Sequence, residues 1–361
     1  MASLLRRLRW PIWPRKPIAF SNSNFARIPV DQTIEEEVLP DYRASRYYPV
    51  RIGEVLRDRY QVVGKLGFGA SSTLFINSVS MGAQLDNELN MYKRMKEKGS
   101  VGHPGRNSVR KLLDSFDVEG PDGRYRCLVH PPLWESVLTV LHRNPVTRLP
   151  VPVLAGILYH LFLALDFLNR ECAIIHTDIK ADNIMFGIRD DSVFRDFEEQ
   201  ELSDPSPRKV LGDRKIYTSH ELRIPKEVGE PVLCDFGSGV CGDEEHQEDV
   251  QPNVYRAPEV ILGAPWTYKI DIWNAGCMVW DIFEGGHLFT GQDPEFHAHR
   301  RELHSEISVP DPISLEEIET NLEGRDKESF LLMMRMMLQW EPSLRSSAKE
   351  LVNSEWLQGQ M

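Results

Sequence analysis

The chain has few cysteines, and no two of them stand in the spacing of a paired site. Its 361 residues include five cysteines, none of them in a C-x-x-C arrangement. This excludes a disulfide framework and a cysteine-based zinc site, and it is typical of a reducing compartment. We also find no apolar run of the roughly 20 residues that a membrane-spanning helix needs. A membrane partner is therefore not expected.

Acidic residues are absent before Asp31, although the whole chain has a net charge of −12. That charge disfavours nucleic acid as a direct partner and suits basic substrates, while plain solubility explains it equally well. The Arg-rich start is typical of a mitochondrial presequence. However, Pro11, Pro14 and Pro17 would interrupt its amphipathic helix. We therefore favour a disordered basic tail and a location in the cytoplasm, the nucleus or both.

Several short motifs follow one another in the second half of the chain. They are His176-Thr-Asp-Ile-Lys-Ala-Asp-Asn183, Asp235-Phe-Gly237, Ala257-Pro-Glu259 and Asp271-Ile-Trp273. An isolated H-x-D-x-x-x-x-N string would be weak evidence, and an unrelated α+β fold is the chance alternative. The four motifs in this order, however, are similar to those of protein kinases.

Three further features resemble the SR-protein kinase family, and within it a fungal-type branch. They are Thr177 where most kinases have arginine, the run from Ile261 to Asn274, and an insert between the first two motifs. The resemblance extends from about Val50 to Trp356. It implies an ATP-dependent kinase that phosphorylates serines in Arg/Ser-rich or other basic proteins, with a role in mRNA processing. The expected partner is a protein substrate, and the chain is expected to be a monomer.

The resemblance also implies an α+β, bilobal protein-kinase fold with a small, mainly β lobe and a large, mainly helical lobe. We expect a disordered tail and lead-in over residues 1–49, the small lobe over 50–134 and the large lobe over 135–357. The polar segment at about 189–230 predicts a mostly exposed loop. Apolar residues at helical spacing predict helices over 84–98, 153–168, 268–284 and 327–340.

The resemblance assigns the chemistry to the first two motifs. Phosphoryl transfer needs an aligned hydroxyl, neutralised phosphate charge and excluded water. Asp178 is predicted to be the general base or orienting carboxylate, and Lys180 to reach the transferring phosphate, as in serine/threonine kinases. Asn183 and Asp235 are oxygen donors that suit Mg²⁺ held also by phosphate oxygens. The expected cofactors are therefore ATP and Mg²⁺.

Three other residues are expected to have structural consequences. Glu259 is predicted to pair with Arg345, and Asp271 to accept backbone N–H bonds from the catalytic loop. Thr177 lacks the charge with which the usual arginine binds a phosphorylated activation segment. We therefore predict that the segment 238–254 is ordered by packing alone. Its acidic residues are candidates for contacting substrate arginines, although acidic loops are more often simply solvated.

The predicted nucleotide-binding residues follow the family pattern less closely. Gly67 and Gly69 let the backbone approach phosphate, but Ser72 replaces the third glycine. Alone, such a pair would more often mark a hairpin turn. If His130 is the gatekeeper, the adenine meets the carbonyl of Pro131 and the N–H of Leu133. The full predicted set is Leu66, Gly67, Gly69, Ser72, Leu74, Glu88, Pro131 and Leu133.

No lysine lies between Lys65 and Lys93, where the family carries the lysine that grips phosphate and pairs with a helix glutamate, here Glu88. Only 13 residues separate Leu74 from Glu88, too few for two strands of about 5–6 residues and their connections. We expect a missing strand and an open sheet edge. There are three explanations. We favour an alternatively spliced or mispredicted product of an active kinase gene. The others are a pseudokinase retained for binding and rescue by a lysine from elsewhere in the chain, of which Lys65 and Lys93 are the nearest.

The sequence leaves three candidate functions. Lys180, Asn183 and Asp235 favour a working serine/threonine kinase. The absent lysine favours a catalytically impaired isoform or a pseudokinase scaffold. A small-molecule kinase, of the type that phosphorylates antibiotics or choline, shares the metal residues but not the Ala257-Pro-Glu and Asp271-Ile-Trp motifs.

Overall fold

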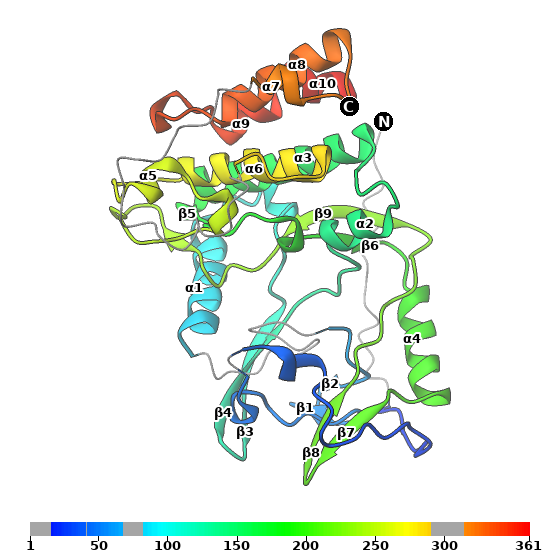
Figure 1. The fold of residues 1–361 in the computed structure, drawn as a ribbon. Coiled ribbons are helices and arrows are strands. Elements are labelled where there is room, and N and C mark those ends of the chain that lie inside the picture. Colours follow the sequence, from blue (N-terminus) through cyan, green and yellow to red (C-terminus); the bar gives the residue numbers. More distant parts are fainter. Residues whose placement is uncertain (1–15, 41, 68–81, 290–313) are drawn as a thin grey trace. The chain divides into compact units, whose positions relative to one another are not determined.

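The computed structural model describes residues 16–40, 42–67, 82–289 and 314–361 (Figure 1). It divides the chain into two compact units. The small unit comprises Met1–Met81, Asp114–Val129 and Asp190–Pro225, and the large unit comprises Gly82–Leu113, His130–Arg189 and Lys226–Met361. The mixed helix and strand content agrees with the predicted α+β class.

The small unit is built from three separate antiparallel hairpins. They are β1 (Val55–Leu56) with β2 (Tyr60–Gln61), β3 (Asp114–Gly120) with β4 (Gly123–Val129), and β7 (Arg208–Leu211) with β8 (Arg214–Tyr217). Within the described part of the unit, no hairpin joins another into a larger sheet. A shared apolar core of Leu56, Val62, Phe116 and Cys127 holds the first two together. Isolated hairpins need such a core to be stable. The segment 68–81, where we expected a strand to be missing, lies outside the described residues, so that expectation stays a prediction.

The polar insert is not an exposed loop, in contrast to the sequence-based expectation. It forms α4 (Ser192–Ser203) followed by the β7–β8 hairpin. Val193, Phe197 and Glu201 recur every four residues and are buried, so the helix has one face that packs. The few apolar residues among many charged ones hid this pattern from a composition-based prediction.

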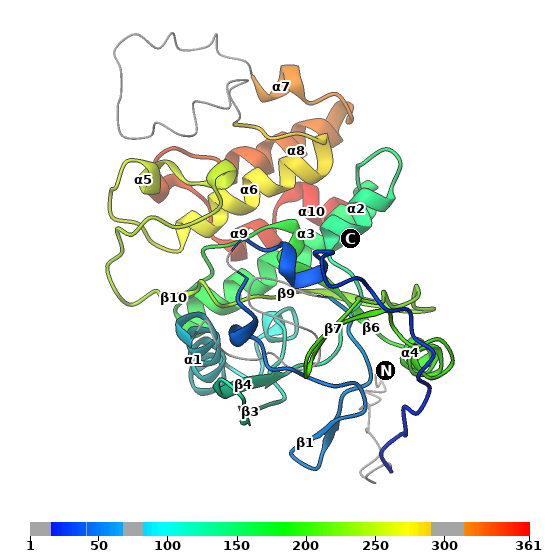
Figure 2. The same ribbon diagram turned by 60° about the horizontal axis from the view of Figure 1, so that its bottom comes forward.

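The lead-in from residue 16 onward is ordered on this insert, so the expected disorder is wrong for that part. It contains the 3₁₀ turns Glu35–Val38 and Ala44–Arg46. Figure 2 shows it running beside α4, where Asn22 Nδ2 donates to the carbonyls of Leu202 and Ser203 at 3.2 and 3.0 Å. Residues 1–15 lie outside the described residues.

The large unit is mainly helical, and Figure 1 shows its helices gathered around α3 and α6. Its helices are α1 (Gly82–Lys98), α2 (Val137–Arg143), α3 (Val151–Asp166), α5 (Pro258–Ile261), α6 (Lys269–Glu284), α7 (Leu315–Ile318), α8 (Gly324–Met337), α9 (Ala348–Val352) and α10 (Glu355–Gln360). The four predicted helices correspond to α1, α3, α6 and α8, with no end shifted by more than three residues. One continuous apolar cluster contains side chains from all four.

Two segments belong to a different unit from the one predicted. The insert Asp190–Pro225, expected within the large lobe, belongs to the small unit. The segment Gly82–Leu113, expected in the small lobe, belongs to the large unit, because Met91, Tyr92 and Met95 of α1 are buried in the large unit's core.

The stretch Val151–Cys172 is, contrary to our expectation, long and apolar enough to cross a membrane, but 67% of its apolar window is buried inside the protein. It is therefore explained as a core helix.

Two short strand pairs complete the large unit. Strand β5 (Ile174–Ile175) pairs with β10 (Val240–Cys241), and β6 (Ile184–Ile188) pairs with β9 (Val228–Leu233), both antiparallel. The first motif lies between β5 and β6, and Asp235 follows β9 closely. These two strand pairs therefore bring the first two motifs together.

Candidate active site

The loop between β5 and β6 is fastened to helix α6. The buried carboxylate of Asp271 accepts hydrogen bonds from the backbone N–H groups of His176 and Thr177, both at 2.8 Å. The Asn274 amide brackets Ile179, accepting from its N–H at 3.0 Å and donating to its carbonyl at 2.6 Å. Thr177 has a left-handed φ of 67°, a conformation that costs energy outside glycine and persists only where such bonds impose it. The predicted role of Asp271 is confirmed.

Asp178 lies between two of the predicted site residues. Lys180 Nζ is 2.8 Å from Asp178 Oδ2. Asn183 Nδ2 donates to the same oxygen at 3.0 Å and to the Asp178 carbonyl at 2.9 Å. These contacts fix the carboxylate through Oδ2. No described residue hydrogen-bonds its Oδ1, which can therefore meet a substrate hydroxyl. The structure therefore brings Asp178, Lys180 and Asn183 together as the sequence predicted.

Asn183 and Asp235 are held next to each other by the β6–β9 pair. The N–H of Cys234 donates to the Asn183 carbonyl at 2.7 Å, and Asp235 adopts a left-handed φ of 62°. Because the Asn183 amide nitrogen is engaged by Asp178, its oxygen is the atom that remains for a metal. An amide and a carboxylate oxygen fit Mg²⁺, which fills its other positions with water and phosphate oxygens.

Helix α1 is linked to the Asp235-Phe236-Gly237 turn by residues that sequence reasoning missed. Asn87 Nδ2 donates to the carbonyls of Gly237 and Gly239 at 2.9 and 2.8 Å. The fully buried Phe236 ring lies 5.3 Å from Tyr92 and 5.2 Å from His176. In the sequence, Tyr92 was indicated only by the helical spacing that places position 92 on the apolar face of α1.

Glu88 of α1 is buried and has no ion pair with any described residue. Burial and the nearby charge of Asp235 raise its pKa to about 7, although the charge of Arg110 acts in the opposite direction. The two lysines considered as substitutes do not fit. Lys65 is buried against Glu36 and Glu35, with 3.2 Å to Glu35, and Lys93 is exposed on α1. Rescue by either lysine therefore finds no support.

The predicted adenine-binding segment begins at His130. Its Nδ1 donates to the Lys111 carbonyl at 2.9 Å, and burial lowers the pKa of the imidazole to about 3, so the ring is neutral. The carbonyl of Pro131 and the N–H of Leu133 form no hydrogen bond with another described residue. Both groups are therefore available for the predicted contacts.

Only some of the remaining predicted nucleotide-binding residues belong to the part of the chain that the structure describes. Leu66 and Gly67 are the last described residues of their segment, in the small unit. Gly69, Ser72 and Leu74 lie outside the described residues. The prediction that this loop covers the phosphates therefore stays a prediction.

The segment after Asp235 is ordered by contacts within the large unit. Thr177 Oγ1 donates to the Ser238 carbonyl at 2.9 Å. The His246 ring stacks on Trp266 with centroids 4.6 Å apart. At its end, Arg345 forms a buried two-pronged ion pair with Glu259, at 2.5 and 2.7 Å. The predicted pairing of Glu259 with Arg345 is confirmed.

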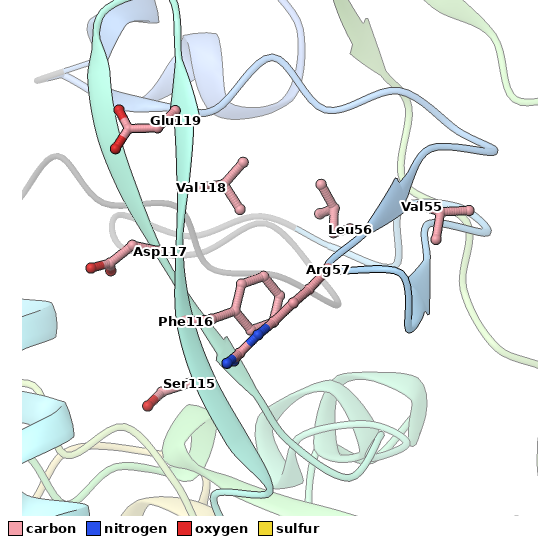
Figure 3. Close-up of a pocket in the computed structure, with 8 residues that line it drawn as sticks. All are labelled: Val55, Leu56, Arg57, Ser115, Phe116, Asp117, Val118 and Glu119. Atoms are coloured by element: carbon pink, nitrogen blue, oxygen red, sulfur yellow. The ribbon is translucent and has the colours of Figure 1, made fainter. Parts of the chain in front are cut away.

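A pocket of about 510 Å³ lies elsewhere, in the small unit (Figure 3). Its walls are Val55, Leu56 and Arg57 on one side and Ser115–Glu119 of β3 on the other. The Arg57 guanidinium covers the Phe116 ring at 5.5 Å. The lining contains none of the predicted catalytic or nucleotide-binding residues, so we assign the pocket no part in the reaction.

Comparison with known proteins agrees with this geometry. The family model "Protein kinase domain" matches residues 137–357. A serine/threonine protein kinase of Aspergillus fumigatus is 36% identical, with 96% of each chain covered. A serine/threonine-protein kinase SRPK of Physarum polycephalum is 28% identical over 71% of this chain and 67% of its own. SRSF protein kinase 3 of Homo sapiens is 30% identical over 60% and 42%.

The alignment with the Aspergillus relative runs over 393 positions, more than the 361 residues of this chain. It therefore contains gaps opposite residues that this chain lacks. The matched family model and these relatives show that the chain belongs to the protein kinase family, as a serine/threonine protein kinase related to the SR-protein kinases.

Proposed function

We propose that this chain transfers the terminal phosphate of ATP, with Mg²⁺, to serines of Arg/Ser-rich proteins. The observation that carries the proposal is the arrangement of Asp178, with Lys180 at 2.8 Å and Asn183 at 3.0 Å from its Oδ2. A carboxylate fixed in this way can orient a serine hydroxyl and accept its proton. Lys180 is placed to neutralise charge on the transferring group.

Bound Mg²⁺ would neutralise and align the phosphates. Asn183 and Asp235 are the residues that would hold it. Asp271 and Asn274 keep the loop in place from α6, so that the reacting carboxylate does not have to be ordered at each turnover. The support for catalysis is therefore the positioned catalytic loop and the pair of residues suited to Mg²⁺, all in the large unit.

The substrate class is supported by the relatives' names and by charge. Two of the related proteins are named SRPK and SRSF protein kinase 3. In the activation segment, Asp243 pairs with Arg94 at 2.7 Å and Asp249 with Arg256 at 2.6 Å. Glu244 and Glu245 are exposed, with no ion pair among the described residues. They are the carboxylates best placed to meet arginines of a substrate.

A peptide series tests this substrate class. The chain should phosphorylate an Arg-Ser repeat peptide at least tenfold faster than a Gln-Ser repeat, and Glu244→Gln with Glu245→Gln should narrow that preference. The same pair of changes should leave the rate on the Gln-Ser peptide unaltered. Equal rates on both peptides would contradict the substrate class while leaving kinase activity intact.

The alternative is a catalytically impaired isoform or a scaffold. It is favoured by the absence of lysine between Lys65 and Lys93 and by a buried Glu88 without an ion pair. If transfer from ATP is not detectable, grafting a lysine-bearing strand between residues 74 and 84 should restore it. Restoration would identify a defective product of a sound large lobe, whereas continued inactivity would support the scaffold.

A further inference from the structure

Backbone hydrogen bonding places Arg110 next to the segment that leads into the Asp235-Phe236-Gly237 turn. Val109 forms a parallel bridge with Leu233, and the Arg110 N–H donates to the Leu233 carbonyl at 2.8 Å. Leu233 precedes Asp235 by two residues. The segment that carries Arg110 is therefore fastened to the chain that presents the metal-binding aspartate.

The side chain of Arg110 lies near groups of that turn, of α1 and of the predicted adenine-binding segment. Its positive charge acts on Glu88 and Tyr92 of α1, on His130 and on Cys234. Its Nε is enclosed and has no hydrogen-bond partner among the described residues. No ion pair within 4 Å links it to any described carboxylate. Arg110 is thus a cation held at the site without a partner.

A neighbouring polar atom is in the same condition. His130 Nε2 is buried and has no hydrogen-bond partner in the described structure, and its ring lies 5.2 Å from that of Tyr92, whose hydroxyl faces the Glu88 carboxylate. Buried polar atoms are almost always satisfied, and leaving one unpaired costs about 1–3 kcal/mol. Two such atoms next to each other, Arg110 Nε and His130 Nε2, point to a site that is completed by a bound group.

We propose that Arg110 takes the place of the missing lysine, pairing with Glu88 and supplying positive charge to the phosphates of ATP beside Asp235. A guanidinium suits this task because it stays charged when partly buried and has donors for both a carboxylate and a phosphate. It approaches from the segment before β3 instead of from the absent strand. The inference rests on the proposed function, since it concerns the same nucleotide site.

Binding of Mg·ATP, measured by titration calorimetry on the full chain, is the primary test. Arg110→Met should weaken Mg·ATP binding by about tenfold or more, the range expected when a charge-assisted hydrogen bond is lost. Arg110→Lys should retain part of the affinity. Lys111→Met is the matched control, since the neighbouring Lys111 is directed to Asn107 at 3.0 Å and its loss should leave binding unchanged.

A double-mutant cycle tests the pairing itself. If Arg110 acts with Glu88, the combined Arg110→Met and Glu88→Gln variant should lose no more affinity than the worse single variant. Losses that add would contradict the pairing. If Arg110→Met does not fold, Arg110→Gln removes the charge while keeping an amide that can satisfy the neighbouring polar atoms, and the same loss of affinity is expected.

The outcomes separate this inference from the proposed function. Unchanged Mg·ATP binding in a folded Arg110→Met or Arg110→Gln variant overturns the inference even if the chain is an active kinase. Mg·ATP binding that depends on Arg110 supports it even if the wild-type chain transfers no phosphate, in which case only the proposed function fails. No binding of Mg·ATP by the wild-type chain overturns the inference.

Discussion

At the scale of single residues, the two carboxylates of the site differ. Asp178 has its predicted hydrogen-bond partners, whereas Glu88 has no ion pair with a described residue. Asp178 has its neighbours at hydrogen-bonding distance, and the sequence motif alone predicted which residues these are. Glu88 was predicted as a site residue from its helix, but its environment was not. Whether a carboxylate is buried beside another depends on packing between segments far apart in sequence, which no local pattern encodes.

The environment of Glu88 predicts a pH-dependent stability. Burial raises its pKa from 4.5 to about 7, so the folded state favours the protonated form. The stabilisation is present below pH 4.5 and is lost as the pH rises through about 7, an effect on the order of 3 kcal/mol for such a shift. Glu88→Gln should remove this dependence and make the chain relatively more stable at pH 8.

Chemical denaturation of both proteins between pH 5 and 8, in buffer free of Mg²⁺ and nucleotide, measures this difference. The free energies of unfolding should be similar at the acidic end and diverge as the pH rises. Parallel profiles for the wild type and Glu88→Gln would show that Glu88 does not titrate as described.

At the scale of elements, helix α6 organises the large unit around the site. It carries Asp271 and Asn274 toward the catalytic loop. The backbone carbonyl of its first residue, Lys269, accepts from Arg345 at 3.1 Å. The sequence predicted α6 and the role of Asp271 because apolar spacing and motif order are local signals. It did not predict the contacts of Asn274 or of the Lys269 carbonyl. It did not predict α4 or the β7–β8 hairpin, since a short amphipathic helix among many charges resembles a polar loop in composition.

Replacing one partner of the Glu259–Arg345 pair should strongly lower the stability of the large unit. Both side chains are buried, with 5% and 0% of their surfaces exposed. Glu259→Gln leaves an uncompensated buried charge and should destabilise the large unit by about 3–5 kcal/mol. Arg325→Gln, which breaks an exposed ion pair with Glu355, is the control and should leave the thermal midpoint unchanged. Comparable midpoints for the two variants would contradict the structural role.

The activation segment predicts independence from phosphorylation. Thr177 bonds the Ser238 carbonyl, and the stacking of His246 on Trp266 anchors the middle of the segment. No added phosphate is needed to order it. Treatment of the purified protein with a phosphatase should therefore leave its transferase rate unchanged. Mass spectrometry verifies that the phosphate has been removed. A drop of tenfold or more would show that phosphorylation does the ordering.

At the scale of the whole molecule, the chain has a large unit with an extensive core and a small unit assembled from dispersed segments. The insert and the N-terminal lead-in hold the small unit together through buried charges. Lys209 Nζ lies 3.0 Å from both carboxylate oxygens of Glu37 and donates to the Gln32 carbonyl at 2.9 Å. Such long-range pairing of two polar segments has no signature in either segment alone, which is why sequence analysis assigned one to disorder and the other to a loop.

Removing the insert tests this organisation. Replacement of residues 192–217 by a short Gly-Ser linker should release the lead-in, because Lys209 and the carbonyls of Leu202 and Ser203 are its partners. Limited proteolysis should then cut within residues 16–49 of the variant while the wild-type chain resists. The large unit should stay protease-resistant in both. Equal resistance of the lead-in in the two proteins would contradict its docking on the insert.

The most direct test of the central claim is Mg²⁺-dependent transfer of phosphate from ATP to an Arg-Ser repeat peptide, compared between the wild type and Asp178→Ala. The positioned catalytic loop predicts transfer by the wild-type chain and its loss in the variant, with both proteins folded. Equal signals in the two, or none from the wild type, would contradict the account of this chain as a working kinase.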